Sequence, residues 1–217
     1  MTTRIWLIVS AMLGVALLAQ AALAEPIAFK LIPNYSRATF KADAPLETIV
    51  GTTAGEGVTG NLTVDPAKPQ GATGTVKVDL STLATGVAKR DEDMRGDKYL
   101  DTANPDHRYA VFEIKNVEVA GALESGKEAP AKVTGILTIK GKPVQVTSDA
   151  RVTYIKLTTE QLETDNQKRF GFSTDNIKVR ATFATTLTNH GIPIPRLLIL
   201  KLSNDLQLET DLTFVRQ

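Results

Sequence analysis

Hydrophobic and polar residues alternate along most of the chain after residue 25. The longest alternating stretch contains Ile177, Val179, Ala181, Phe183, Thr185 and Leu187. Such alternation places every second side chain on one face of a β-strand. Turn residues, such as Asp65-Pro66 and those at 140–143, separate the neighbouring stretches. The pattern predicts eight or nine strands joined by short turns.

Strands at this spacing are typical of an all-β antiparallel barrel or sandwich and not of βαβ units. Closing the sheet would remove the exposed edges that favour aggregation. Many positions expected to face inward carry small side chains: Ala38, Ala42, Gly60, Val76, Val78, Val179 and Ala181. Small inward side chains favour a hollow interior that holds an apolar ligand, and a solid core of valines is the alternative.

Two segments interrupt the strand pattern. Residues 45–50 predict one turn of helix, with Pro45 at its first position. Residues 157–168 predict a polar, exposed excursion that is partly helical, with Thr158 or Thr159 as its N-cap.

The most strongly charged stretch is RDEDMRGDKYLD, residues 90–101. It does not fit a calcium-binding loop, because Arg95 stands where a ligand oxygen is needed and Thr102 where a bidentate glutamate is needed. An enzymatic site built on Asp91, Asp93 and Asp97 has no nucleophile or base motif beside it.

A short helix over residues 87–95 explains the charged stretch better. Asp91 and Arg95 have the spacing of a favourable ion pair on a helix, and Gly96 stands where a left-handed residue ends one. Met94, Tyr99 and Leu100 are free to face the barrel. We therefore interpret the stretch as a helix that braces one end of the barrel.

The two histidines give no metal-binding motif. His107 and His190 lie far apart in the sequence and each is next to turn residues, so we interpret both as turn residues. A zinc ion shared between them and a carboxylate is an alternative without a supporting spacing. We predict no metal site, no catalytic residue and no cofactor.

The first 24 residues have the pattern of a cleavable signal peptide. An apolar run at residues 5–19 is shorter than the roughly 20 residues of a membrane span, and Ala22-Leu23-Ala24 fits a cleavage site. We expect cleavage after Ala24, a periplasmic or secreted location, one domain over residues 25–217, and no membrane anchor afterwards.

Composition narrows the function classes. The chain has 25 basic and 24 acidic residues, and loss of Arg4 with the leader leaves 24 of each. A balanced charge gives no support for nucleic-acid binding, which needs a basic face. The absence of cysteine excludes disulfides, thiol chemistry and a cysteine-linked lipid anchor.

A group of residues around the charged stretch resembles the YceI-like family. It consists of Thr85-Gly86, Arg90-Asp91, Met94-Arg95, Tyr99-Leu100-Asp101, Pro105 and Phe112. Weaker agreement extends over residues 26–217, for example at residues 36–40 and 135–144. The resemblance implies an eight-stranded, lipocalin-like antiparallel barrel that is extracytoplasmic in bacteria. It also implies that a polyisoprenoid, an isoprenoid quinone or a similar long amphiphile binds inside.

Three segments depart from the family pattern. Residues 42–47 replace a histidine-containing strand end, residues 188–192 replace an Asp-Phe-Gly-like step, and residues 192–200 are unusually apolar. These departures indicate a subgroup that binds a different ligand or that binds no isoprenoid at all. The apolar segment also motivates the alternative function, an extracytoplasmic protein-interaction module with a filled barrel.

The preferred hypothesis is non-catalytic binding, transport or sequestration of a long-chain amphiphile in the barrel. Such a tail needs an apolar tube with contacts at alternate positions of many strands. The wall residues predicted from alternation are Phe40, Leu62, Val78, Phe112, Ile114, Leu137, Val146, Val152, Val179, Phe183 and Phe214. The sequence leaves the oligomeric state open, and a dimer is one option.

Overall fold

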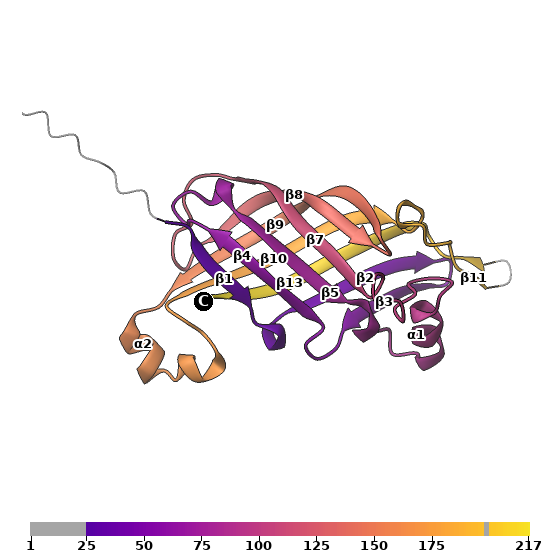
Figure 1. Ribbon diagram of the computed structural model, residues 1–217, viewed down its shortest axis with the longest axis horizontal. Coiled ribbons are helices and arrows are strands. Elements are labelled where there is room, and N and C mark those ends of the chain that lie inside the picture. Colours follow the sequence, from indigo (N-terminus) through magenta and orange to yellow (C-terminus); the bar gives the residue numbers. More distant parts are fainter. Residues whose placement is uncertain (1–24, 198–199) are drawn as a thin grey trace, which may run out of the picture.

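A computed structural model describes residues 25–197 and 200–217, which wind into a closed antiparallel barrel (Figure 1). Eight strands form the ring: β1 (Ile27–Leu31), β4 (Val58–Val64), β5 (Thr73–Asp79), β7 (Tyr109–Val119), β8 (Glu128–Ile139), β9 (Lys142–Lys156), β10 (Asp175–Thr186) and β13 (Asp205–Arg216). The ring closes because β13 pairs with both β10 and β1. The predicted all-β fold with an eight-stranded antiparallel barrel is therefore confirmed.

The barrel wall extends beyond the ring at one end. In β13, Phe214 lies opposite Leu31 of β1, whereas Leu208 lies opposite Phe40 of β2 (Arg37–Ala44). β2 pairs in turn with β3 (Glu47–Thr53), and β3 pairs with β6 (Leu83–Ala84). One half of β13 thus pairs with β1 of the ring, and the other half pairs with β2 of the extension.

The helical turn predicted for residues 45–50 was wrong, because these residues belong to a hairpin. Pro45 and Leu46 form its turn, and Ala44 pairs with Glu47. The strand that follows, ETIVGTT, is rich in β-branched residues, whose restricted χ1 angles favour an extended backbone. A proline fits the first position of a helix and the second position of a turn equally well, so the local sequence was ambiguous.

β7 contains a β-bulge that keeps its apolar side chains inside the barrel. The register shifts between Ile114 and Asn116. Phe112 and Ile114 line the interior before the shift, and Val117 and Val119 line it afterwards. Because one extra residue reverses the alternation, the sequence pattern breaks although the strand continues.

The two α-helices lie at opposite ends of the barrel (Figure 1). One end carries α1 (Ala88–Arg95) and a small hairpin of β11 (Arg196–Leu197) and β12 (Leu200–Lys201), and the other carries α2 (Thr159–Thr164) and the C-terminus. The 3-10 turns are η1 (Pro33–Tyr35), η2 (Pro69–Gly71), η3 (Leu80–Thr82), η4 (Gln167–Phe170) and η5 (Thr188–His190). The cap of α2 is Thr158, one of the two predicted caps, and its side chain forms a capping box with Gln161.

No helix in the described part of the chain is long and apolar enough to cross a membrane. The predicted signal peptide, residues 1–24, lies outside the described residues, so it and the boundary at residue 25 stay predictions.

α1 confirms the short helix predicted near residues 87–95, but its charges bind other partners than expected. Asp91 is 8% exposed, and its Oδ1 accepts hydrogen bonds from the Thr85 backbone N–H (2.8 Å) and hydroxyl (2.6 Å). The Thr85 hydroxyl, followed by the N–H, lowers the pKa of the Asp91 carboxyl. Arg95 donates to the Leu83 carbonyl, so the predicted ion pair between Asp91 and Arg95 was wrong.

Gly96 ends α1 without the predicted left-handed conformation. Its φ is −65° and its ψ is 165°, and its N–H donates to the carbonyls of Glu92 and Asp93. A positive φ, 55°, occurs nearby at Asp101, whose carboxylate lies 2.8 Å from Nδ1 of His107. His107 is therefore a polar turn residue, as its sequence position indicated.

His190 lies in the turn η5, but its side chain is only 1% exposed. Its Nδ1 lies 3.1 Å from the Lys142 carbonyl oxygen, so this nitrogen carries the proton and donates. Its Nε2 then accepts from the Thr185 hydroxyl at 2.9 Å. Burial lowers the pKa of the imidazole, and the neutral ring joins the start of β9 to the end of β10.

Replacing Asp91 with alanine is expected to lower the melting temperature by about 5 °C, because the Thr85 N–H and hydroxyl lose their acceptor. Asp93→Ala is the matched control on the same helix, since Asp93 forms only an exposed ion pair with Lys89. Thermal unfolding followed by circular dichroism measures both. Equal melting temperatures for the two variants would contradict the anchoring role of Asp91.

Lowering the pH below about 6.5 is expected to destabilise the protein through His190. The imidazole has a folded-state pKa below its ordinary value, so the unfolded chain takes up the proton first and stability is lost as the pH falls. Urea unfolding at pH 7.5 and pH 5 tests this expectation. His190→Gln should show a smaller loss between the two pH values, and an equal loss in both proteins would refute it.

Candidate functional site

The interior of the barrel contains a cavity of about 870 Å³. Its volume lies near the upper end of the roughly 300–1,000 Å³ typical of small-molecule sites. The wall is almost entirely apolar, and it runs from the buried cluster around Phe29 and Phe214 to the one around Leu80 and Leu137. A polar group on the wall, the hydroxyl of Ser148, donates to the Val133 carbonyl and is therefore already satisfied. The cavity thus offers mainly dispersion contacts and apolar burial.

The structure places ten of the eleven predicted wall residues on the cavity. These are Phe40, Leu62, Val78, Phe112, Ile114, Leu137, Val152, Val179, Phe183 and Phe214. Val146 does not line the cavity and is buried in the cluster around Leu137 and Ile139. Strand alternation therefore located the wall, and binding of a ligand by these residues remains a prediction.

Many inward-facing side chains are only partly buried. Seven of the predicted wall residues have intermediate exposure: Phe40, Val78, Phe112, Ile114, Val152, Val179 and Phe183. In a filled core these side chains would be covered by their neighbours across the barrel. Their exposed surface faces the cavity, so the interior is hollow.

A row of small side chains makes room at the middle of the barrel. In register, Ala131 of β8 lies opposite Ala150 of β9, which lies opposite Ala181 of β10. Ala181 lies opposite Thr210 of β13, and Thr210 opposite Ala38 of β2. We call these five residues the small-residue rung. Directly opposed side chains on one face of a sheet meet across the strands, so the rung removes bulk from five neighbouring strands at the same level.

The end of the barrel near the C-terminus carries a polar cluster, in which Tyr154 and Asp175 are buried and Arg216 is exposed. Tyr154 donates its hydroxyl to Oδ1 of Asp175, and Arg216 donates to Oδ2 at 3.0 Å. Burial alone would raise the pKa of Asp175, but the hydrogen bonds from Tyr154, Arg216 and Thr174 lower it. Burial and the Asp175 carboxylate raise the pKa of Tyr154. The carboxylate stays charged and the phenol protonated, so the cluster is a structural tie.

The opposite end of the cavity is its mouth, which is formed by α1, by the β2–β3 turn, and by Ile192, Pro195, Arg196, Lys201 and Leu202. Leu46 at the β2–β3 turn lines the mouth and is 84% exposed, whereas Ile192 is 4% exposed. The apolar segment 192–200 thus begins inside the mouth, and residues 198–199 lie outside the described part. A filled barrel, which the interaction-module alternative assumed, is not what the structure has.

The carboxylates of the charged stretch do not converge on a common point. Asp91 binds Thr85, Asp93 lies 2.9 Å from the Lys89 ammonium, and Oδ1 of Asp97 accepts from the Lys98 N–H. Within the described residues, no group of three or more His, Asp or Glu side chains could hold a metal ion. Met94, Tyr99 and Leu100 line the mouth, in agreement with the bracing role expected for this stretch.

Sequence reasoning missed two parts of the site. Ala131 lines the cavity, and only the strand register, through Ala150, brings it to the level of Ala181. Arg196 and Lys201 also line the mouth, but the sequence-based prediction considered only the apolar residues of the segment 192–200. A signal for the second pair was present, because the two cations flank the apolar residues 197–200 symmetrically.

Solved structures from several bacteria share this fold. BcnA of Burkholderia cenocepacia is 16% identical with a TM-score of 0.60, covering 84% of this chain and 98% of that one. A polyisoprenoid-binding domain from Saccharophagus degradans, implicated in plant cell wall breakdown, is 14% identical with a TM-score of 0.62, covering 88% and 99%. The YceI protein of Campylobacter jejuni is 16% identical with a TM-score of 0.58, covering 79% and 86%.

No curated protein matches the chain. The sequence itself matches the YceI-like domain over residues 29–214, which include every strand of the barrel except the ends of β1 and β13. The resemblance inferred from the charged stretch is therefore confirmed, and the chain belongs to the YceI-like family.

Proposed function

We propose that this protein binds the apolar tail of a long-chain amphiphile, such as a polyisoprenoid or an isoprenoid quinone, inside the barrel. The observation that carries the proposal is the partly exposed apolar surface that faces the cavity. Exposed apolar surface is unfavourable in water and becomes favourable when a hydrocarbon covers it. The protein would carry or sequester the lipid without changing it chemically.

The energetics of tail burial are sufficient for useful affinity. Burial contributes roughly 0.8 kcal/mol per CH₂ group, and an isoprene unit has five carbons. A few buried units therefore offset the cost of association and leave the roughly 8 kcal/mol that micromolar binding needs. No single residue has to dominate, in agreement with a wall whose residues come from most strands.

Two further observations support a lipid carrier. The similar domain from Saccharophagus degradans is described as polyisoprenoid-binding. The predicted signal peptide at residues 1–24 would deliver the chain to the periplasm or the exterior. In such an aqueous compartment, a membrane lipid needs a protein that covers its apolar tail. We assign no catalytic step, since the carboxylates of the charged stretch are engaged in structural contacts.

Filling the small-residue rung is expected to abolish lipid binding. Ala181→Phe would place a ring in the middle of the cavity, whereas Thr182→Phe on the same strand would place it outside, because Thr182 is exposed. Both variants should keep the β-sheet circular dichroism spectrum. Native mass spectrometry of the purified mature proteins should show a bound hydrophobic molecule in wild type and Thr182→Phe, and none in Ala181→Phe.

Loading with lipid extract provides the second measurement for the same variants. A wild-type protein that stays empty after incubation with bacterial lipid extract would overturn the proposed function. Equal loading of Ala181→Phe and wild type would show that the lipid binds outside the cavity.

A further inference from the structure

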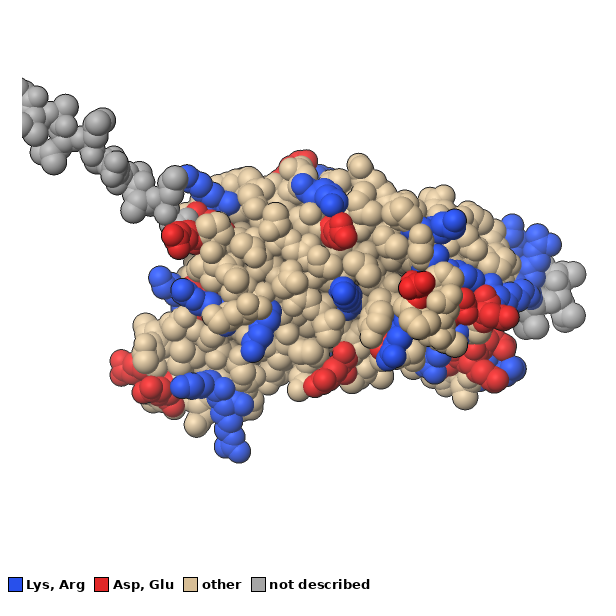
Figure 2. All heavy atoms as spheres, viewed as in Figure 1, with Lys and Arg blue, Asp and Glu red and all other residues tan. Residues whose placement is uncertain are grey.

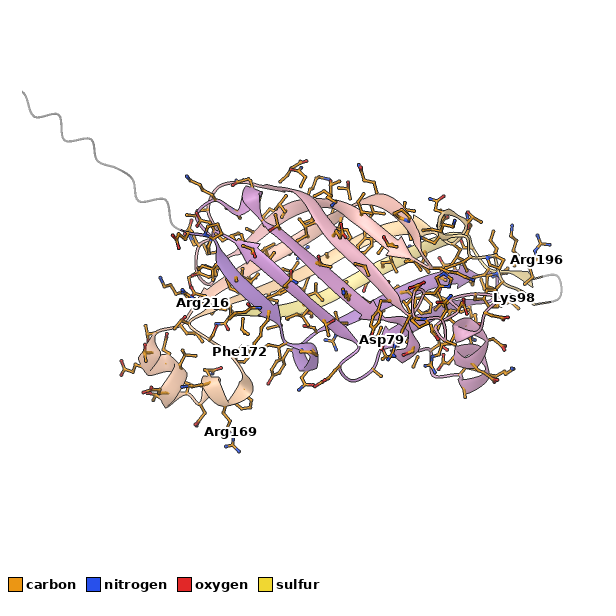
Figure 3. All side chains as sticks on the ribbon, in the orientation of Figure 1. Asp79, Lys98, Arg169, Phe172, Arg196 and Arg216 are labelled. Carbon is orange, nitrogen blue, oxygen red and sulfur yellow. The ribbon has the colours of Figure 1, made fainter. Side chains whose placement is uncertain are left out.

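A loop residue, Leu123, lines the cavity at the end opposite the mouth. It belongs to the buried cluster around Phe29 and Phe214, and among the buried residues of this cluster in the described chain it is the one that lies outside the strands. Its side chain is 7% exposed and forms part of the cavity lining. Figure 3 shows the two ends concerned, with Arg216 of β13 towards the end of this cluster and Arg196 at the mouth.

The loop that carries Leu123 joins β7 to β8 over residues 120–127. Every other residue of this loop is exposed, so Leu123 alone turns inward. Glycines with a left-handed backbone lie on both sides of it, Gly121 with a φ of 76° and Gly126 with a φ of 81°. Because glycine adopts such angles readily, the chain can turn towards the cavity and away again within a few residues.

Backbone hydrogen bonds hold the loop against the barrel. The N–H of Leu123 donates to the Pro66 carbonyl at 2.7 Å, and the N–H of Gly126 donates to the Tyr154 carbonyl at 2.8 Å. Neither hydrogen bond uses the side chain of Leu123. The size of this side chain can therefore change while the loop keeps its place.

A tail inside the barrel is confined to the direction of the barrel axis. Each strand of the ring pairs with two neighbours, and Figure 2 shows side chains covering the outside of the wall between the two ends. A tail can thus gain further contacts only by reaching deeper, until it meets the residues opposite the mouth. Among these, Val64 and Phe214 belong to strands of the ring, whereas Leu123 belongs to the loop.

We propose that Leu123 limits the length of the tail that the cavity accepts and so selects for the number of isoprene units. The proposal rests on the proposed function and deepens it, because it names a residue that determines specificity. A tail that just reaches Leu123 covers the apolar wall, a shorter one leaves part of the wall uncovered, and a longer one keeps carbons in water at the mouth. Each buried CH₂ group changes the affinity about fourfold, so one isoprene unit is enough for clear selection.

A mixture of ubiquinones with one headgroup and different tails tests this limit. The mature protein is incubated with equimolar ubiquinones of two to ten isoprene units, and native mass spectrometry reads the bound length from the mass. Wild type should show a maximum at one length. Leu123→Ala should increase the next longer tail relative to this maximum by roughly tenfold, since it makes room for up to three further carbons. Leu123→Phe should move the maximum to a shorter tail.

Leu31→Ala is the matched control. Leu31 belongs to the same buried cluster and is 6% exposed, but it is not part of the cavity lining. The exchange removes the same number of carbons, so it should lower the melting temperature as Leu123→Ala does. The distribution of bound lengths should stay that of wild type. A similar shift in Leu31→Ala would show that lost packing, and not the position of Leu123, changes the selection.

The outcomes separate this inference from the proposed function. A wild-type protein that binds no ubiquinone of any length would refute both. Equal binding of all lengths by wild type, or an unchanged maximum in Leu123→Phe, would refute the length limit while the proposed function stands. Leu123→Phe decides the question even if Leu123→Ala loses its β-sheet circular dichroism spectrum, because it leaves no cavity in the buried cluster.

Discussion

The hollow interior depends on the backbone hydrogen bonds that close the ring through β13. This strand pairs along its whole length with β10 on one side, and on the other side it divides its pairing between β2 and β1. Every strand of the ring then has two neighbours, so the wall satisfies its own polar groups without help from a packed core. Because the wall supports itself, side chains in the middle of the barrel are free to leave space.

Packed side chains at the two ends of the barrel supply the buried contacts that the hollow middle lacks. Near the C-terminus, Phe29, Ile177 and Phe214 pack closely beside the Tyr154–Asp175 hydrogen bond. Near α1, Leu80, Leu137 and Ile139 pack together, and Asp91 fixes the helix that lies over them. The charged stretch at residues 90–101 therefore has a structural role.

Local patterns in the sequence predicted the wall because the direction of a side chain in a strand depends only on its position along that strand. Phe112, Val179 and Phe183 were found in this way. In β7 the alternation could be followed only to Ile114, because the bulge reverses it beyond that residue. At residues 45–50 the prediction was wrong, because a proline fits both the start of a helix and a turn. The partner of Asp91 was wrong for another reason. A spacing of four residues predicts an ion pair in an isolated helix, but Thr85 offers two donors from the preceding loop.

The small-residue rung could not be predicted because it exists only between strands. Ala131, Ala150 and Ala181 are unremarkable in their own segments, and pairing alone brings them to one level. The width of the cavity thus depends on a few side chains that take no part in the backbone hydrogen bonds that close the barrel. Exchanges between alanine, valine and leucine at this level would widen or narrow the bore in steps of a methyl group or two, with the hydrogen-bonded frame unchanged. Proteins that share this barrel at low sequence identity can therefore differ in the width of the molecule that fits inside it.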